Sequence, residues 1–123
     1  LIIAPIVGPK VISGSTRMKA DTATKMVLNM LTTGTMVRLG KTYGNLMVDL
    51  RASNTKLVAR SRRIVSILTD LSETEAETLL QQCDGELKTA VVVNLKSVTP
   101  QEARRLISDA GGHLRQALED HEK

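Results

Sequence analysis

The sequence is nearly without aromatic residues: among its 123 residues Tyr43 is the only one, and there is neither Phe nor Trp. A hydrophobic core must therefore be built from Leu, Ile, Val, Met and Ala, and this composition favours helices. The same absence leaves no rings on which the bases of a single-stranded nucleic acid could stack. We therefore predict a mostly α protein with a modest core and no nucleic-acid partner.

Cysteine is equally scarce, since Cys83 stands alone and cannot form a disulfide within the chain. A chain without disulfides fits a reducing compartment. The sequence also lacks a recognisable signal peptide and any apolar run near the ~18 residues that span a bilayer. We therefore predict a cytoplasmic protein without a membrane partner, in which Cys83 is a half-buried structural thiol rather than a nucleophile.

Histidine is limited to His113 and His121, and neither has a spacing that would bind a metal or assist a Ser or Cys nucleophile. We expect surface or capping roles for both and no metal site. The glutamates lie at helix starts or at positions expected to be exposed, where they suit the helix dipole and solubility. These are Glu73, Glu75, Glu77, Glu86, Glu102, Glu119 and Glu122.

The formal charge is +4, and five basic residues are concentrated in one stretch, Arg51, Lys56, Arg60, Arg62 and Arg63. An apolar stripe with heptad-like spacing runs through the same stretch, which predicts one long helix over residues 45–68. The basic residues then form the solvated remainder of that helix. The stripe consists of Met47, Leu50, Leu57, Ile64 and Leu68.

The most informative segment is a run rich in Gly, Ser and Thr that leads into a helix start, residues 8–25, GPKVISGSTRMKADTATK. Glycines allow the backbone to approach a ligand closely, and the first N–H groups of a helix point at an anion. Ser15 and Thr16 could donate hydrogen bonds, while Arg17 and Lys19 add positive charge. The segment predicts a phosphate-binding turn at these four residues. The alternative is a turn that binds nothing, in which Arg17 ties the loop to the rest of its domain.

Read whole, this run resembles the signature GPExxxGSTRxKAGTxxK of the N-acetylmuramic acid 6-phosphate etherases and the related glucokinase regulatory protein. Four later segments resemble the etherases in the same order: residues 44–49 (GNLMVD), Asn54-x-Lys56-Leu57, residues 87–91 (LKTAV) and residues 111–118 (GGHLRQAL). Two positions depart from the signature. Lys10 stands where the family usually has Glu, and Asp21 stands where it has a small residue, which places a carboxylate near the proposed anion site.

The resemblance implies a carbon–oxygen lyase that cleaves the lactyl ether of N-acetylmuramic acid 6-phosphate to N-acetylglucosamine 6-phosphate and D-lactate. This reaction belongs to amino-sugar catabolism and peptidoglycan recycling. The resemblance further implies a sugar isomerase (SIS) domain, a homodimer, and neither a metal nor an organic cofactor. The family's catalytic glutamates precede the segment seen here, so we assign no catalytic residue and expect the chain alone to be inactive.

Two other functions stay open. A non-enzymatic sugar-phosphate-binding regulatory protein would lack the etherase glutamates in its remaining sequence. A freestanding basic helical adaptor would instead bind polyanions in a salt-sensitive way. In the regulatory relatives a C-terminal lid contributes to the sugar-phosphate pocket, which draws attention to Lys88, although we expect a solvent-facing helix lysine there.

The N-terminal part of the chain predicts a strand followed by a helix. Residues 1–7 (LIIAPIV) are a short β-rich apolar run typical of one buried strand. A lone strand cannot satisfy its backbone groups, and the chain opens on Leu1, so we expect it to begin inside a larger protein. A helix over residues 17–38, capped by Ser15 or Thr16, is apolar on most sides and predicts cover by a sheet or a second subunit.

Short helices are predicted beyond Asp70. Ser72 precedes an acidic first turn, and Asp84-Gly85 ends that helix. Further helices are expected over residues 86–96, over residues 101–110 after the Thr99-Pro100 cap, and over residues 113–119 after Gly111-Gly112.

The overall expectation is a mostly α chain in three parts. Residues 1–43 would be the C-terminal remnant of an α/β SIS domain, with one strand plus a helix. Residues 44–69 would form a long connecting helix, and residues 70–123 a small three-helix bundle that resembles ubiquitin-associated (UBA) domains.

Overall fold

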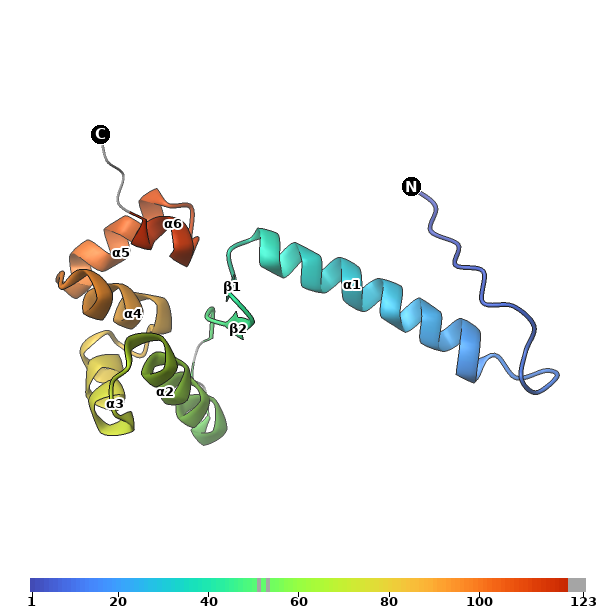
Figure 1. The fold of residues 1–123 in the computed structure, drawn as a ribbon, viewed down its shortest axis with the longest axis horizontal. Helices are drawn as coiled ribbons and strands as arrows, with labels where there is room; N and C mark the ends of the chain where they lie inside the picture. Colours follow the sequence, from blue (N-terminus) through green and yellow to red (C-terminus); the bar gives the residue numbers. More distant parts are fainter. Residues whose placement is uncertain (51, 53, 120–123) are drawn as a thin grey trace. The chain divides into compact units, whose positions relative to one another are not determined.

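The computed structural model describes residues 1–50, 52 and 54–119, and the chain divides into two compact units, Leu1–Met36 and Val37–Lys123. Regular structure in the described residues comprises six α-helices, one π-helix and a two-stranded sheet (Figure 1). The prediction of a mostly α chain is therefore confirmed.

Residues 1–7 do not form the predicted buried strand. They lie in neither a helix nor a strand, and the side chains of Leu1, Ile2 and Ile6 are almost fully exposed. A strand needs a neighbour that exchanges backbone hydrogen bonds with it, and no described segment pairs with these residues. The prediction of a strand is thus wrong for this chain, because β propensity alone does not supply a pairing partner.

The helix predicted over residues 17–38 is present. It begins as a π-helical turn, η1 (Arg17–Asp21), and continues as α1 (Thr22–Arg38). Thr16 is the N-cap residue of η1 but its side chain makes no capping hydrogen bond. Apolar side chains along the helix are largely open to solvent, including Met26, Met30 and Leu31. No helix in the described part of the chain is both long enough and apolar enough to cross a membrane.

The second unit begins with a β-hairpin in place of the predicted helical start at residue 45. Strands β1 (Thr42–Tyr43) and β2 (Leu46–Met47) pair antiparallel, with Thr42 opposite Met47 and Tyr43 opposite Leu46. The connecting turn has two residues, and its first residue, Gly44, adopts φ +57°, a value that glycine adopts at little cost.

Helix α2 (Thr55–Thr69) starts about ten residues later than predicted. Its N-cap is Asn54, whose side chain accepts a hydrogen bond from the backbone N–H of Leu57 at 2.9 Å, an arrangement typical of a helix N-terminus. Met47 and Leu50 fit the spacing of the apolar stripe, yet Met47 lies in β2. The long connecting helix is therefore shorter than expected, and strand β2 lies within the range predicted for it.

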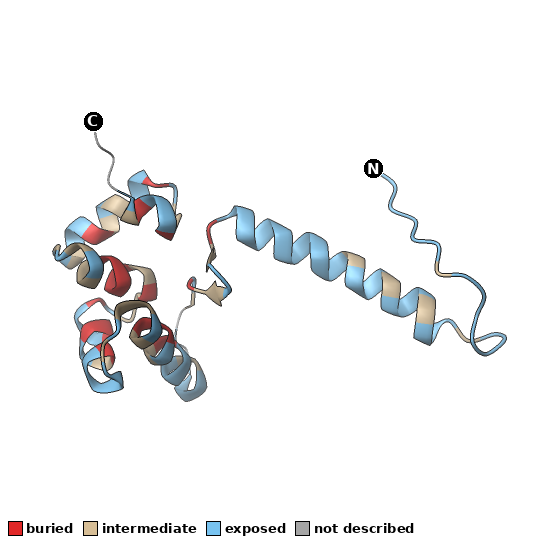
Figure 2. Ribbon diagram, viewed as in Figure 1, coloured by how far each residue is buried: buried red, intermediate tan, exposed pale blue. Residues whose placement is uncertain are grey.

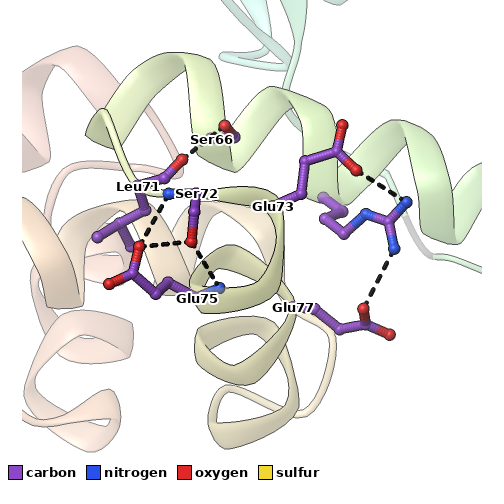
Figure 3. A network of polar contacts seen from close by, with 7 residues as sticks. Ser66, Leu71, Ser72, Glu73, Glu75 and Glu77 are labelled. Carbon is purple, nitrogen blue, oxygen red and sulfur yellow. Dashed lines mark hydrogen bonds and ion pairs between the residues drawn. The ribbon is translucent and has the colours of Figure 1, made fainter.

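Four short helices complete the second unit: α3 (Glu73–Gln82), α4 (Leu87–Lys96), α5 (Pro100–Asp109) and α6 (Leu114–Leu118). Ser72 caps α3 in a reciprocal arrangement with Glu75, in which each residue bonds the backbone N–H of the other (Figure 3). Thr99 accepts a hydrogen bond from the backbone of Glu102 and Pro100 opens α5, as predicted.

The core of the second unit is made of small and medium-sized aliphatic side chains, as the lack of aromatics predicts. Its members come from the hairpin segment and from α2 to α6, and the buried positions lie on the inner sides of these helices (Figure 2). The largest fully buried side chains are Leu87, Leu114, Val48, Val65, Val91 and Val92. Val48 thereby fixes the segment after β2 to the helical core.

Gly40 marks a close approach of two backbones within the second unit. It is buried with φ +68°, and a Cβ added there would lie 2.9 Å from Cγ of His113 and 3.1 Å from the carbonyl oxygen of Gly112. Such distances leave no room for a side chain. The loop before β1 therefore rests directly on the turn between α5 and α6.

Candidate functional site

The predicted phosphate-binding residues lie together at the start of η1 in the first unit. Ser15 and Lys19 are half-buried, whereas Thr16 and Arg17 are exposed. The N–H of Ser15 donates to the carbonyl oxygen of Ile12 at 3.0 Å, which closes a turn just before the helix. Arg17 makes no ion pair with any described residue, and its guanidinium is therefore available to an anion.

Lysine 19 faces the first glycine of the run. Gly8 has φ +70°, and a Cβ added there would lie 3.8 Å from Nζ of Lys19. The ammonium group thus lies beside a stretch of backbone without a side chain. The N–H of Asp21 donates to the carbonyl oxygen of Thr16 at 3.2 Å, the i to i+5 bond that makes this turn π-helical. The exposed carboxylate of Asp21 shares this turn with Lys19.

A second feature is a cleft of about 940 Å³ that lies entirely within the second unit. It is lined by the segment after β2, the turn between α3 and α4, the start of α4, and α5. Charged side chains of both signs line it, namely Asp49, Asp84, Glu86, Lys88 and Arg104. The sequence analysis assigned none of these residues to a site, although the resemblance to the regulatory protein drew attention to Lys88.

Lys88 is a largely buried structural cation, not the solvent-facing lysine predicted from the sequence. Its side chain is only 13% exposed, and its ammonium lies 3.2 Å from Oδ1 of Asp49 and 2.8 Å from the carbonyl oxygen of Gly112. Lys41 contacts the other oxygen of Asp49 at 2.9 Å. The hydrogen bond from Lys41, together with the charge of Lys88, holds the pKa of Asp49 below its ordinary value despite some desolvation.

Arg104 closes the opposite side of the cleft by binding two carboxylates. Its guanidinium donates to Oδ2 of Asp84 at 2.6 Å and to Oε2 of Glu86 at 2.8 Å. These hydrogen bonds raise the pKa of Arg104, and the bond to Glu86 has the larger effect. Asp84 adopts φ +55°, so Arg104 ties α5 to a turn in a left-handed conformation. The hydroxyl of Thr89 also donates to Oε2 of Glu86, at 2.8 Å.

Three of the glutamates expected at helix starts or at exposed positions bind a partner in or beside α3. Glu73 and Glu77 of α3 bind Arg62 of α2 at 3.0 and 3.1 Å, and Glu75 belongs to the cap at Ser72 (Figure 3). Glu102 lies in the first turn of α5, and Glu119 is the C-cap residue of α6. Glu122 lies outside the described residues. No described glutamate is held free in the cleft as a general base would be.

Cys83 is more deeply buried than the half-buried thiol predicted, and His113 occupies a cap position although its side chain makes no capping hydrogen bond. Cys83 is fully buried at the end of α3, and this burial raises the pKa of its thiol. His113 is the N-cap residue of α6 and packs against Gly40, while His121 lies outside the described residues. Within residues 1–50, 52 and 54–119, no group of three His, Cys, Asp or Glu side chains is arranged to hold a metal ion.

Comparison with known proteins identifies relatives along nearly the whole chain. Residues 44–86 match the family described as the C-terminal lid domain of glucokinase regulatory protein. Proteins named N-acetylmuramic acid 6-phosphate etherase are 65% identical over 118 residues in Rhodopirellula baltica and 56% identical over 116 residues in Streptomyces coelicolor. The Vibrio cholerae protein named N-acetylmuramic acid 6-phosphate etherase 2 is 49% identical over 123 residues.

These matches cover 96%, 94% and 100% of this chain, but only 39%, 37% and 40% of the respective relatives. The chain thus spans about two fifths of the length of the relatives it matches. Identity of this extent cannot arise from composition alone, and it confirms the resemblance that the motifs carry. The chain is a homologue, over nearly its whole length, of proteins named N-acetylmuramic acid 6-phosphate etherase.

Proposed function

We propose that this chain is the C-terminal part of an enzyme that cleaves the lactyl ether of N-acetylmuramic acid 6-phosphate. The products would be N-acetylglucosamine 6-phosphate and D-lactate, and the setting would be cytoplasmic peptidoglycan recycling. The observation that carries the proposal is the 65% identity over 118 residues to the Rhodopirellula baltica protein of that name. Because the chain spans about two fifths of that protein, the activity is proposed for the whole enzyme.

The chemistry needs an acid and a base that are free to exchange protons with the sugar. A base must remove the proton α to the sugar aldehyde, lactate must leave from C3, and water must add to the unsaturated product. Carboxylates of the second unit already bind Lys, Arg or a helix cap: Asp49, Glu73, Glu75, Glu77, Asp84 and Glu86. We therefore propose that the acid and base lie in the remaining three fifths of the enzyme, and that this chain alone is inactive.

The contribution that we propose for the first unit is substrate binding. Ser15, Thr16, Arg17 and Lys19 would hold the 6-phosphate through backbone N–H groups, hydroxyls and two positive charges. Residues 1–43 would complete an SIS domain, residues 44–69 would connect it to the bundle, and residues 70–123 would form the UBA-like part. The exposed apolar side chains of α1 suit burial in that domain or in a homodimer interface.

A second candidate is a sugar-phosphate sensor without catalysis. The match of residues 44–86 to the lid domain of glucokinase regulatory protein favours it. Both candidates need the phosphate site and differ only in whether ether cleavage follows. Catalysis and ligand binding must therefore be measured separately.

A chimera tests the proposal directly. The matching 118 residues of the Rhodopirellula baltica etherase would be replaced by this chain, and D-lactate release from N-acetylmuramic acid 6-phosphate would be measured with a lactate dehydrogenase assay. We expect activity within about tenfold of the intact etherase, because a 1.4 kcal/mol error in positioning costs that factor. The 123-residue chain alone should release no lactate, and lactate release by it would contradict the assignment of acid and base elsewhere.

Substitutions within the chimera test the phosphate residues. Arg17→Ala and Lys19→Ala should raise KM by about tenfold each while changing kcat less, since they remove binding to a group that does not react. Arg38→Ala, which removes an exposed cation at the end of α1, is the matched control for loss of one cation. A chimera that binds the sugar phosphate in calorimetry but releases no lactate would favour the sensor. Unchanged KM in both variants would show that the phosphate binds elsewhere.

A further inference from the structure

One flank of α2 carries positive charge that no described residue neutralises. Lys56, Arg60 and Arg63 are spaced i, i+4 and i+7, so they lie on one face of the helix, and all three are exposed. None of them forms an ion pair with a described residue. Five other cations of the same unit do have carboxylate partners, namely Lys41, Arg62, Lys88, Arg104 and Arg105.

An apolar side chain continues this face by one turn. Ile67 follows at i+11 and is 54% exposed, although Ile64 and Val65 beside it are buried in the core. The N-terminal end of α2 adds to the positive field, because its first turn contains no acidic residue, in contrast to the first turns of α3 and α5. We name Lys56, Arg60, Arg63 and Ile67 the basic stripe.

The opposite flank of α2 shows what kind of element such a stripe accepts. There α3 packs alongside α2 and supplies Glu73 and Glu77, spaced i and i+4, to the guanidinium of Arg62 at 3.0 and 3.1 Å (Figure 3). An acidic helix is therefore the neighbour that α2 already binds on one side. The basic stripe is the corresponding surface on the other side, with no acidic helix of the described chain against it.

We propose that the basic stripe docks an acidic helical segment of a different protein. That segment would present carboxylates at helical spacing to Lys56, Arg60 and Arg63, and an apolar residue one turn further on to Ile67. A second copy of this chain fits less well, because most carboxylates of the second unit are already bound within it, including Asp49, Glu73, Glu77, Asp84 and Asp109.

Two other anionic partners are disfavoured by the same residues. A membrane surface would need a broad apolar face beside the charges, and the stripe has the single residue Ile67. A nucleic acid would be expected to find aromatic or amide side chains among the cations, and the stripe has neither. The proposal goes beyond the etherase function and does not depend on it.

The test uses the full 123-residue chain and a fluorescently labelled, stapled helical peptide of about 15 residues. The peptide carries Glu at i, i+4 and i+7 and Leu at i+11, and an isomer of equal composition has its glutamates spread around the helix. Fluorescence anisotropy at physiological salt should give binding at least about fivefold tighter for the first peptide, given the modest strength of exposed ion pairs. Equal binding of the two isomers would overturn the proposal.

Charge reversal locates the contact. Lys56→Glu, Arg60→Glu and Arg63→Glu together should abolish binding of the acidic peptide and create binding to the matching Lys peptide. The control combines Lys25→Glu, Arg38→Glu and Arg105→Glu, which changes the net charge equally at exposed positions elsewhere, and it should retain most of the binding. If the first variant unfolds, the corresponding Gln triple replaces it. Similar loss in the two variants would show a net-charge effect and overturn the proposal.

Three further measurements test whether a nucleic acid, a second copy of this chain or the rest of the enzyme occupies the basic stripe instead. Tighter binding of duplex DNA than of the acidic peptide would identify a nucleic-acid surface instead. Self-association in sedimentation that the stripe variant abolishes would identify a second copy. Loss of peptide binding in the etherase chimera would show that the rest of the enzyme covers the stripe. Each of these three outcomes would overturn the proposal that an acidic segment of a different protein binds the basic stripe. Peptide binding retained by the chimera would support the proposal.

Discussion

Lys88 and Asp49 form an ion pair, 3.2 Å from Nζ to Oδ1, that joins α4 to the segment following β2. Lys88 also donates to the carbonyl oxygen of Gly112 before α6, and Asp49 also binds Lys41 before β1. Four parts of the second unit therefore meet at one pair of side chains. Because Lys88 is mostly buried, loss of its carboxylate would leave a desolvated positive charge.

Asp49→Asn should therefore lower the free energy of unfolding by about 1 kcal/mol, a value kept small because the Asp49 side chain is 39% exposed. Urea unfolding followed by circular dichroism measures it. The control is Asp109→Asn, which removes a solvent-exposed ion pair to Arg105 at 3.7 Å and should cost less than about 0.5 kcal/mol. Equal effects of the two substitutions would show that the Asp49 ion pairs stabilise no more than a surface pair.

The same carboxylate predicts a pH dependence. The folded-state pKa of Asp49 is lowered, chiefly by the hydrogen bond from Lys41, so the unfolded chain binds its proton at higher pH than the folded chain. Its contribution to stability is fully present above the unfolded value of about 3.9 and is lost as the pH falls through the folded pKa. The urea midpoints of the native chain and of Asp49→Asn should differ at about pH 6, and the difference should shrink as the pH falls below the unfolded value of about 3.9. A difference that persists unchanged in acid would contradict this assignment.

Gly40→Ala should destabilise the second unit by about 2–4 kcal/mol, because the new Cβ would meet both φ strain and the His113 ring. Gly85→Ala is the matched control. Gly85 also has positive φ, +76°, but nothing lies within 4 Å of its added Cβ, so only the backbone cost of about 1 kcal/mol remains.

The double variant Gly40→Ala, His113→Ala separates the two contributions. Removing the imidazole should recover part of the loss, leaving the contact with the Gly112 carbonyl oxygen and the backbone strain. If Gly40→Ala and Gly85→Ala unfold at the same urea concentration, the close approach at Gly40 is not tight.

Cys83 should resist thiol reagents in the folded protein. Its sulfur is fully buried and its pKa is raised, so both access and thiolate formation are suppressed. Labelling with Ellman's reagent at about pH 8 should be at least a hundredfold slower than in the urea-unfolded chain. Rapid labelling without denaturant would show that α3 opens readily at its C-terminal end.

Local signals in the sequence predict most of the helical boundaries. Ser72 with Glu75, Thr99 with Pro100, and the Asp84-Gly85 turn each act within a few residues, and the structure confirms all three. Such signals are readable because caps and turns depend on neighbouring backbone groups.

Features that depend on distant partners could not be predicted. The strand expected over residues 1–7 depends on a neighbouring strand, and the role of Lys88 depends on Asp49, far upstream in the chain. The helix predicted from apolar spacing is also wrong at Met47 and Leu50. A heptad-like repeat is compatible with a helix, but it is equally compatible with the apolar residues of a hairpin. The phosphate residues Ser15 to Lys19 remain a prediction, which the chimera experiment tests.

The exposed methionines of α1 have a chemical consequence. Met26 is 57% and Met30 62% exposed, whereas the sulfur of Cys83 is sealed inside the helices of the other unit. Methionine sulfur accepts an oxygen atom from peroxide without first losing a proton, and the sulfoxide is polar where the thioether was apolar. Mild peroxide would therefore oxidise the exposed methionines and make one side of α1 more hydrophilic, while Cys83 stays reduced. The sulfur atoms of the two units would thus be oxidised to unequal extents.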